Sequence, residues 1–457
     1  MNIEAIYARL PILIQQVAVS LEGWRTVRSR YAPEFHRLLH ECTARGRISQ
    51  EEAFTLRDAR LAAFVTFAAA HVPYYRELFA RLGIEPRDIC GLADLEALPV
   101  LTKADVQPEP SRFIPDTPQG RTIITHTSGS TGAGLRFPVT LSAYREQWAF
   151  WWRYRMAHGI TLDEPCLYFG GRSVVPLSQH RPPYWRYNRP GRQLLFSGYH
   201  LGPDTASDYL DAMERSGFRW MHGYPSMLAL IAGYALERQR TIGMQWVTIG
   251  AESLLPHQVE IIQQAFGVKP LGHYGLAEGA ANISMCPERR FHIDEDFAAV
   301  ECLPLNDGIY RLVGTNFTNY AFPLLRYDTG DTATLSSDSC PCGRPGRVVA
   351  SIDGRREDYL ITRDGRKLGR LDHVFKDMVH IREAQLRQSR AGEATVLIVR
   401  APGYSTADEH MLREEMLKRV GTEIAFTIEY VDAIPRTRSG KLRFVVSTID
   451  EGVISKP

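Results

Sequence analysis

Three short apolar runs in the middle of the chain carry glycine near their carboxyl ends. They span Cys166–Gly171, Phe218–Ser226 and Trp246–Glu252, and helical patterns at Met227–Glu237 and Pro256–Phe266 follow two of them. Strands that alternate with helices predict an α/β fold, in which ligands bind at the carboxyl ends of the strands. The glycines therefore stand where we expect a ligand to approach.

A glycine-rich stretch precedes these runs at residues 122–140, with the sequence TIITHTSGSTGAGLRFPVT. Two β-branched or apolar runs flank a polar loop, which predicts a strand, a loop and a second strand. Glycines let backbone amides approach an anion, and hydroxyls add donors, so the loop is suited to a polyphosphate. No Gly-Lys-Ser/Thr follows, so this is not a Walker loop. The alternative is a flexible hairpin turn. The candidate phosphate-binding residues are Ser128, Gly129, Ser130, Thr131 and Gly132.

Size and composition narrow the class of protein. A chain of 457 residues has room for two or three domains, and its net charge of +2 gives no argument for nucleic acid as a partner. The most apolar early stretch, Leu10–Leu21, is interrupted by Gln15 and Gln16 and has the spacing of a helix with a packed face. It also lacks the features of a signal peptide. We expect a cytoplasmic protein that binds no membrane. Seven scattered cysteines argue against a disulfide framework.

The pattern changes towards both ends of the chain. Residues 1–80 are typical of helices, and Val72–Tyr75 is predicted to end the helix over Glu51–Ala70. An aromatic helix at Ala143–Ala157 is predicted to lie in the core. Thr102 is predicted to cap a short helix. From Gly308 the pattern favours strands, at Ile309–Gly314, Pro323–Tyr327 and Thr332–Leu335. The polar segment Asp353–Glu357 is typical of a linker, and a small α/β unit follows it.

Four further stretches join the glycine-rich loop as candidates for chemistry. They are Gly250–Glu252 (GAE), His273–Glu278 (HYGLAE), Arg326–Asp331 (RYDTGD) and Ile434–Leu442 (IPRTRSGKL). Tyr274 is suited to stacking on a base, and Glu278 to holding a magnesium ion that bridges phosphates. Asp331 could accept hydrogen bonds from both ribose hydroxyls. Lys441 could neutralise the charge that develops when a carboxylate attacks a phosphate. Each stretch also occurs in ordinary turns, but five in this order favour function.

The order and the residues of these motifs resemble those of the adenylate-forming superfamily, which includes acyl-CoA synthetases, luciferases and peptide-synthetase adenylation domains. Within it the chain is similar to the phenylacetate–CoA ligase branch and its CapK-like group, over roughly residues 60–450. The stretches that carry the resemblance are LPVLTKADV at Leu98–Val106, HGYPSM at His222–Met227, HYGLAEG at His273–Gly279 and GRLDHVFKD at Gly369–Asp377.

The resemblance implies a fold and a division of the chain. It predicts a large N-terminal domain with mixed sheets and helices at residues 1–353, with a helical start to about residue 95. A hinge at residues 354–358, which includes Glu357, leads to a small mobile α+β domain at residues 359–457. In this superfamily the C-terminal domain rotates between the two half-reactions, and a few-residue hinge can absorb that change. Relatives are often dimers, so a homodimer is possible.

The resemblance also implies a reaction and the residues that serve it. A carboxylate and ATP give an acyl-adenylate and pyrophosphate, and an acceptor then attacks the mixed anhydride. The loop Ser128–Gly132 is expected to hold the ATP phosphates, Glu278 to bind Mg²⁺, and Lys441 to catalyse adenylation. Tyr274 and the stretch of Gly250, Ala251 and Glu252 are expected to line the adenine, and His273 and Gly275 are expected to take part in binding the nucleotide. Asp331 is expected at the ribose, and Arg355 at the ribose or a phosphate.

The acyl group and its acceptor stay open at this stage. The acyl pocket is predicted near residues 168–172, 220–225 and 272–275, with Tyr168, Gly170, Arg172, His222, Gly223 and Tyr224 as its candidate residues. Its aromatic character favours an aryl or similar carboxylic acid, although such linings also hold aliphatic acids. CoA is the default acceptor, whereas a free amine or a carrier protein remains an alternative because the loop Arg363–Gly369 differs from that of phenylacetate ligases. A non-catalytic nucleotide-binding relative is the alternative of another class.

Three cysteines and a histidine form a candidate metal site. Cys286 and His292 lie close in sequence, and Cys340 and Cys342 flank Pro341. Such a soft four-ligand set is suited to structural Zn²⁺. By resemblance, some members of the phenylacetate-ligase-like group carry zinc at a matching place. Cys302 is a competing ligand, and buried free thiols are the alternative to a metal.

Overall fold

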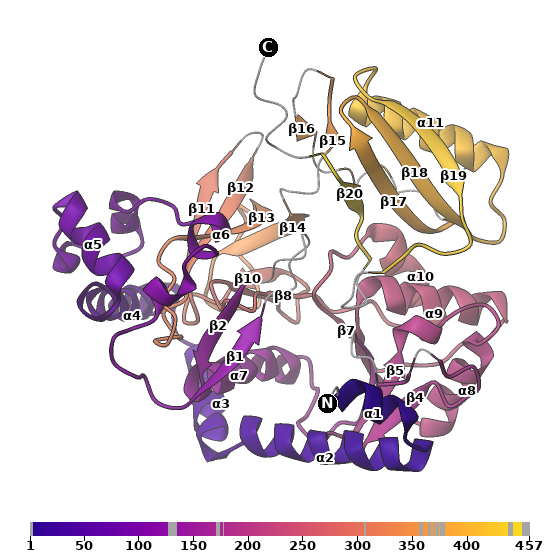
Figure 1. Ribbon diagram of the computed structural model, residues 1–457, viewed down its shortest axis with the longest axis horizontal. Coiled ribbons are helices and arrows are strands. Elements are labelled where there is room, and N and C mark those ends of the chain that lie inside the picture. The colour runs from indigo at the N-terminus through magenta and orange to yellow at the C-terminus, as the bar shows by residue number, and fades with distance from the viewer. Residues whose placement is uncertain are drawn as a thin grey trace. The chain divides into compact units, whose positions relative to one another are not determined.

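The structure is a computed structural model. It describes residues 3–126, 135–170, 174–176, 178–305, 308–355, 360–363, 367–368, 371, 374, 380–436 and 442–449. The described chain forms two compact units. The first unit consists of Met1–Trp24, Asp163–Leu271 and Gly354–Pro457, and the second of Arg25–Leu162 and Gly272–Asp353. Figure 1 labels their helices and strands. Each unit combines sheets with helices, which confirms the predicted α/β class.

The central sheet of the first unit has five strands in the order β4-β5-β3-β6-β7. β3, β5, β6 and β7 run parallel, and β4 pairs with β5 in the antiparallel direction. The strands are β3 (Cys166–Gly170), β4 (Trp185–Asn188), β5 (Gln193–Ser197), β6 (Trp220–Gly223) and β7 (Trp246–Ile249). As predicted, glycines end β3 and β6, and Gly250 directly follows β7.

Helices connect these parallel strands, as crossovers between parallel strands require. α8 (Ala206–Ser216) connects β5 to β6, and α9 (Pro225–Glu237) connects β6 to β7. α10 (Pro256–Phe266) follows β7, and Figure 1 shows α9 and α10 side by side. Phe169, Met221 and Val247 of the strands bury against Leu210 of α8 and Ile231 of α9. The predicted helices at residues 227–237 and 256–266 are confirmed. Proline stands at the first position of α9 and of α10, where its missing N–H costs nothing.

The C-terminal part of the first unit forms a second sheet, with the strand order β19-β18-β17-β20. Its elements are β17 (Ile381–Arg390), β18 (Glu393–Arg400), α11 (Thr406–Val420), β19 (Ala425–Tyr430) and β20 (Val445–Ser447), and a short ladder joins β15 (Leu360–Ile361) to β16 (Lys367–Leu368). Leu386, Val396 and Ile398 pack on Leu412 and Met416 of α11. This sheet and its helix are the small α/β unit expected from the sequence.

The second unit is built on a seven-stranded sheet with the order β11-β12-β13-β14-β10-β9-β8. The strands are β8 (His273–Gly275), β9 (Asn282–Met285), β10 (Phe291–Ile293), β11 (Ala299–Pro304), β12 (Ile309–Thr315), β13 (Tyr327–Leu335) and β14 (Val348–Arg355). Two expectations are wrong here. Residues 327–335 form one continuous strand instead of two short ones. The segment Asp353–Glu357 is not a linker throughout, because β14 continues to Arg355.

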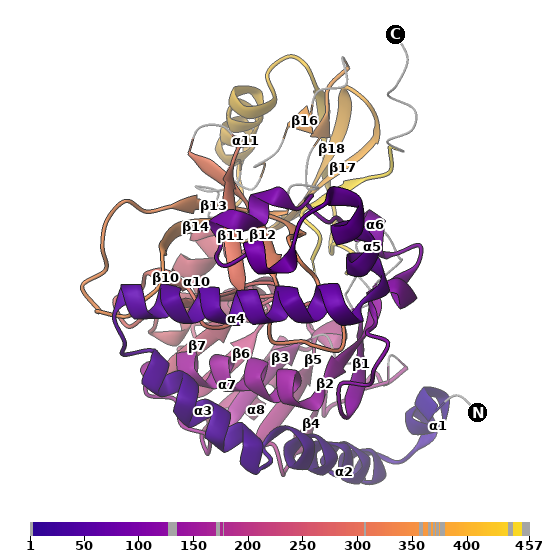
Figure 2. The same ribbon diagram turned by 90° about the vertical axis from the view of Figure 1, so that its left-hand side faces the viewer.

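Helices of the second unit pack around this sheet. They are α3 (Pro33–Arg45), α4 (Gln50–His71), α5 (Pro73–Leu82), α6 (Lys103–Val106) and α7 (Leu141–Ala157), and Figure 2 shows α3 and α7 side by side. As predicted, Val72–Tyr75 ends the helix over Glu51–Ala70, since α4 stops at His71 with Val72 as its cap. Pro73 then starts α5 at a first-turn position that suits proline. Thr102 caps α6 as predicted, since its side chain accepts a hydrogen bond from the Asp105 amide.

The N-terminal helices are α1 (Ile3–Arg9) and α2 (Ile12–Arg30). The helix predicted for Leu10–Leu21 is confirmed, but its packed face is not. The exposed fractions of Leu13, Val17 and Leu21 are 81%, 67% and 52%. Among the described helices, none combines the length and the hydropathy that crossing a lipid bilayer requires.

The segments on either side of the glycine-rich loop form two paired strands. β1 (Thr122–His126) and β2 (Arg136–Thr140) form the predicted antiparallel ladder, in which His126 lies opposite Arg136. The chain then enters α7, which starts at Leu141 because the Thr140 hydroxyl accepts a hydrogen bond from the Ala143 amide at 3.0 Å. The aromatic side chains of α7 only partly match the predicted core position. Phe150, Trp152 and Tyr154 are buried, whereas Trp148 and Trp151 are partly exposed.

Candidate active site and metal cluster

Several predicted site residues lie outside the part of the chain that the structure describes. They are Ser128, Gly129, Ser130, Thr131, Gly132, Arg172, Glu357 and Lys441. Arg355 ends β14, and only its backbone is described. The roles expected for these residues therefore stay predictions, and the geometry below concerns the others.

In the first unit, a row of side chains crosses three parallel strands near their carboxyl ends. The register places Tyr168 of β3 beside His222 of β6, and His222 beside Thr248 of β7. The Tyr168 and His222 rings lie 5.5 Å apart between centroids. His222 Nδ1 and the Thr248 hydroxyl are 2.9 Å apart, and Trp220 Nε1 donates to the same hydroxyl at 2.9 Å. The structure thus brings Tyr168 and His222 together.

The glycines of the predicted acyl pocket stand where a side chain does not fit. A Cβ at Gly170 would lie 2.3 Å from the Tyr168 ring, and a Cβ at Gly223 would lie 2.4 Å from the Phe169 carbonyl oxygen. Tyr224 packs half-buried on the core, and its amide donates to the same Phe169 oxygen at 3.1 Å. Sequence reasoning missed Thr248, although its register position beside His222 follows from aligning the two strands.

The turn after β7 joins the C-terminal stretch of the same unit. Ala251 has a φ of 68°, which is uncommon for a residue with a Cβ and marks a tight turn. The Glu252 carboxylate that follows accepts hydrogen bonds from the Ser226 amide at 3.2 Å and from the Leu442 amide at 3.0 Å. Burial raises the pKa of Glu252, although these donors and the Arg436 charge act in the opposite direction. Glu252 therefore holds the backbone of the residue that directly follows Lys441.

A second contact holds this C-terminal stretch, and sequence reasoning missed it. Arg436 Nη1 donates to the Ser226 hydroxyl at 3.1 Å, and the same guanidinium pairs with Glu383 of β17. Ser226 belongs to the first turn of α9. The basic run in IPRTRSGKL was the available signal, but the sequence does not say which arginine is paired inside the protein.

In the second unit, two predicted nucleotide-binding residues touch. The Tyr274 hydroxyl of β8 donates to Asp331 Oδ2 of β13 at 2.7 Å. On the same face of β13, the Tyr327 hydroxyl donates to Glu278 Oε1 at 3.3 Å. The exposed fractions of Asp331 and Glu278 are only 6% and 8%. The structure therefore joins the HYGLAE and RYDTGD stretches through two carboxylates, each held by a tyrosine.

Electrostatics keeps the Tyr274 hydroxyl in its donor form. Burial, together with the Asp331 carboxylate, raises the pKa of Tyr274 well above its ordinary value. The phenol thus stays protonated at neutral pH and orients the Asp331 carboxylate. A carboxylate oxygen such as those of Glu278 is the kind of hard ligand that Mg²⁺ prefers.

His273 belongs to a different set of contacts from Tyr274. Neighbouring residues of a strand point to opposite faces, so His273 and Tyr274 lie on opposite faces of β8. His273 Nε2 lies 2.9 Å from Asn282 Oδ1, and Trp151 Nε1 donates to the same oxygen at 3.2 Å. Gly275 leaves little room on this face, since a Cβ there would lie 3.1 Å from the His273 ring. Burial lowers the pKa of His273 to about 4, so its ring is neutral at pH 7.

The four predicted metal ligands gather in the second unit. The ligand atoms of Cys286, His292, Cys340 and Cys342 all lie within 4.8 Å of one another. Cys286 Sγ lies 3.6 Å from Cys340 Sγ, and Cys342 Sγ lies 3.5 Å from His292 Nε2. Cys302 lies elsewhere, with its sulfur 3.8 Å from Arg347 Nη1.

These separations fit a tetrahedral zinc ion. With bonds of about 2.3 Å to sulfur and about 2.0–2.1 Å to nitrogen, tetrahedral angles place two sulfurs about 3.8 Å apart and a sulfur and a nitrogen about 3.6 Å apart. Three thiolates and one imidazole form a closed four-ligand set, which is typical of structural zinc and leaves no position for substrate. The donor set and its spacing therefore suit Zn²⁺ in a structural role.

Comparisons with known proteins find relatives over most of the chain. The family model of the CapK C-terminal domain matches residues 360–448. Protein CapK of Staphylococcus aureus is 26% identical over 97% of this chain and 99% of that protein. The phenylacetate–coenzyme A ligase of Thermus thermophilus is 25% identical over 87% of this chain and 97% of that protein. The indoleacetate–lysine synthetase of Pseudomonas savastanoi is 34% identical over 36% of this chain and 40% of that protein.

A solved structure supports the same fold. The 2-hydroxyisobutyryl-CoA ligase in its postadenylation state aligns with a TM-score of 0.70 and 17% identity, covering 90% of this chain and 92% of that one. The fold is therefore the α/β adenylate-forming fold, with a large N-terminal domain and a C-terminal domain. The full-length similarities to CapK and to a phenylacetate ligase agree with this fold. The chain is therefore similar to CapK and to a phenylacetate–CoA ligase over most of its length, and it has the fold of the adenylate-forming enzymes.

Proposed function

We propose that this protein is a ligase that activates an aryl or similar carboxylic acid with MgATP and then transfers the acyl group, with CoA as the first choice of acceptor. The first half-reaction forms an acyl-adenylate and releases pyrophosphate. The second forms the thioester and releases AMP. The observation that carries the proposal is the buried Asp331 carboxylate, which the Tyr274 hydroxyl holds at 2.7 Å next to the HYGLAE stretch.

Each residue has a physical task in this proposal. Asp331, oriented by Tyr274, would accept hydrogen bonds from the ribose. Glu278 would hold Mg²⁺, which neutralises phosphate charge when bound. Lys441 would approach the carboxylate as it attacks the α-phosphate, where a fixed positive charge stabilises the transition state. Tyr168 and His222, in contact across β3 and β6, would line the acyl pocket with Arg172.

The domain division belongs to the same proposal. Residues 1–353 would form the large domain, residues 354–358 with Glu357 the hinge, and residues 359–457 the mobile domain that carries Lys441. Two observations support this division. The CapK C-terminal family model begins at residue 360, and a boundary between the compact units falls between Asp353 and Gly354.

The first test is substrate-dependent release of pyrophosphate from MgATP across a panel of aryl and alkyl carboxylic acids. We expect release with one class of acid, and AMP as the nucleotide product. ADP as the product would contradict adenylation and favour a kinase or ATPase. No release with any acid, while ATP still binds, would favour the non-catalytic relative.

The similarity to an amide-forming synthetase favours a second candidate, in which an amine receives the acyl group. The carrier-protein alternative is tested in the same way. With the acid identified, CoA, amines and a phosphopantetheinylated carrier protein are added one at a time, and mass spectrometry identifies the product. We expect the thioester of CoA. An amide as the only product would replace CoA by an amine as the acceptor.

Asp331→Asn is expected to raise the KM for MgATP by about tenfold or more, because hydrogen bonds to a charged group contribute about 1.5–3 kcal/mol. Tyr274→Phe removes only the group that orients Asp331 and should have a smaller effect. The measurement is the initial rate of pyrophosphate release against ATP concentration.

A matched control lies on the same strand. Asp328 points to the opposite face of β13 and pairs with Arg311 at 2.6 Å, so Asp328→Asn should leave the KM for ATP unchanged. Equal KM values for Asp331→Asn and the unmodified protein would remove Asp331 from the ribose site.

A further inference from the structure

One face of the β8–β9–β10 region carries a continuous row of polar side chains. The register pairs Ser284 of β9 with both His273 of β8 and His292 of β10. Residues two apart in a strand share a face, so Asn282 and Cys286 lie on the same face as Ser284. The four candidate zinc ligands Cys286, His292, Cys340 and Cys342 are called the Cys/His cluster below. The row therefore runs from this cluster at one end to His273 in the HYGLAE stretch at the other.

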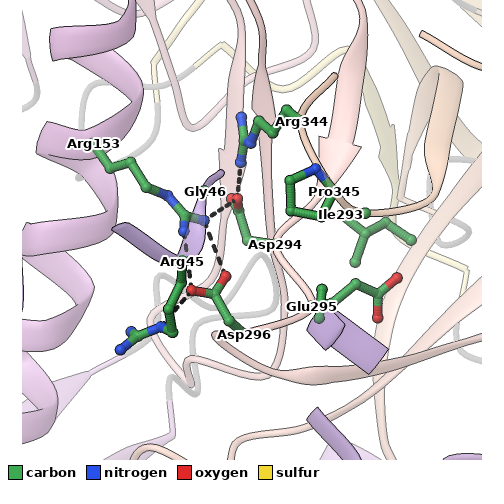
Figure 3. Close-up of a pocket in the computed structure, with 11 residues that line it drawn as sticks. Arg45, Gly46, Arg153, Ile293, Asp294, Glu295, Asp296, Arg344 and Pro345 are labelled. Atoms are coloured by element: carbon green, nitrogen blue, oxygen red, sulfur yellow. Dashed lines mark hydrogen bonds and ion pairs between the residues drawn. The ribbon is translucent and has the colours of Figure 1, made fainter. Parts of the chain in front are cut away.

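Asp294, which follows β10, lies at the centre of this row. Its side chain is almost completely buried, and four donors share its two oxygens. Asn282 Nδ2 and the Ser284 hydroxyl donate to Oδ2, the latter at 2.9 Å. Arg153 Nη2 donates to Oδ1 at 2.6 Å, and Arg344 pairs with the same oxygen (Figure 3).

The Asp294 carboxylate acts as the acceptor in every one of these contacts. Two of its four donors are the guanidinium groups of Arg153 and Arg344, which are positively charged and can only donate. Arg344 also connects the Asp294 carboxylate to Cys342, because the backbone amide of Arg344 donates to Cys342 Sγ at 3.4 Å.

Asp294 determines which way the Asn282 amide points. An ionised carboxylate only accepts hydrogen bonds, so it selects the NH₂ group of Asn282 and turns the Asn282 oxygen towards Trp151 and His273. Trp151 Nε1 can only donate to that oxygen, which agrees with this orientation. Since Asn282 Oδ1 is an acceptor, neutral His273 must carry its proton on Nε2 and leave Nδ1 as an acceptor.

We propose that Asp294 is a positioning residue for the nucleotide site, acting through Asn282 to set the tautomer and orientation of His273 beside Tyr274. This inference rests on the proposed function only where it assigns β8 to the nucleotide. Its structural part, the control of His273 by Asp294, is independent of any activity.

Asp294→Asn tests the inference because it keeps the shape and removes the acceptor-only character. An amide has one oxygen and one NH₂ group, so it cannot accept from the arginine pair and from Asn282 together. If its oxygen turns to the arginines, its NH₂ group faces Asn282 and forces that amide to flip. His273 Nε2 then meets an NH₂ donor and must lose its proton to Nδ1.

The matched control is Asp296→Asn. Asp296 is also buried and pairs with Arg153 at 3.0 Å and with Arg45 at 2.8 Å, but no described contact joins it to Asn282 (Figure 3). Both substitutions disturb the same arginine cluster, and only the one at Asp294 breaks the path to His273. A purely structural role for these carboxylates predicts equal effects of the two variants.

The measurement is ¹⁵N NMR of histidine-labelled full-length protein, with the His273 signals assigned by their loss in His273→Gln. We expect the protonated Nε2 and bare Nδ1 of His273 in the unmodified protein and in Asp296→Asn, and the opposite tautomer or an exchange-broadened pair in Asp294→Asn. An unchanged His273 in Asp294→Asn, or equal changes in both variants, would overturn the proposal.

A second variant covers the case in which Asp294→Asn does not fold. Asn282→Ala leaves three donors on Asp294 and removes the acceptor of His273 Nε2, so the His273 signals should change here too. An unchanged His273 in this variant would also overturn the proposal.

Kinetics tests the second half of the inference. The KM for MgATP should rise about tenfold in Asp294→Asn, and kcat should change less. An increase of this size is expected when a residue acts on a site through its neighbours. An unchanged KM together with altered His273 signals would restrict Asp294 to a local role. Absence of pyrophosphate release in the unmodified protein would instead refute the proposed function, and the NMR result would still decide the structural part.

Discussion

Lys441→Ala is expected to lower acid-dependent pyrophosphate release by about 10²–10³-fold, the loss typical of removing one preorganised transition-state donor. The lysine directly follows Gly440 in the sequence. Its neighbour Leu442 is held by the Glu252 carboxylate at 3.0 Å, and Arg436 is held by Ser226. Because these contacts persist in the variant, the loss should appear in kcat rather than in folding.

The matched control is Lys269→Ala, which removes an exposed lysine of the first unit. It should release pyrophosphate at the unmodified rate, and both variants should bind ATP with unchanged affinity in calorimetry. Full activity in Lys441→Ala would contradict the role of this lysine. Loss of ATP binding in that variant would show that the lysine acts on the ground state instead of the transition state.

Loss of the Cys/His cluster is expected to have the second large effect. Cys286 is completely buried, and its sulfur lies 3.6 Å from Cys340 Sγ. Cys286→Ser should remove one zinc ion per chain and lower the free energy of unfolding by about 3–5 kcal/mol, since loss of a structural metal is among the largest single effects. Mass spectrometry of the metal content and denaturant titration measure the two effects.

Cys302→Ser is the control, because Cys302 was the competing ligand and lies outside the cluster. It should keep its zinc and nearly all of its stability. Zinc retained in Cys286→Ser, or lost in Cys302→Ser, would contradict the assignment. No zinc in the unmodified protein would leave the cluster as buried thiols. Chelation in the unmodified protein should reproduce the stability of Cys286→Ser.

Much of the local structure could be predicted because it depends on neighbouring residues. The β1–β2 ladder around the glycine-rich loop, the strand ends at Gly170 and Gly223, and the Thr102 cap are all set within a few residues. Predictions failed where packing overrode the local pattern. Polar residues such as Asp353 continued β14, because pairing with neighbours in a sheet can outweigh the preference of a short polar segment for a linker.

The sequence by itself determined the α/β class, the order of the motifs, and the four candidate metal ligands by type. Only the tertiary structure decided which of these residues touch. Tyr274 and Asp331 are 57 positions apart on strands that are not neighbours in the sheet, and Cys286 and Cys340 are 54 apart. Asp294 and its four donors carry no motif at all. Strand order and register bring such residues together, and both depend on burying whole faces of a sheet, which no short stretch of sequence encodes.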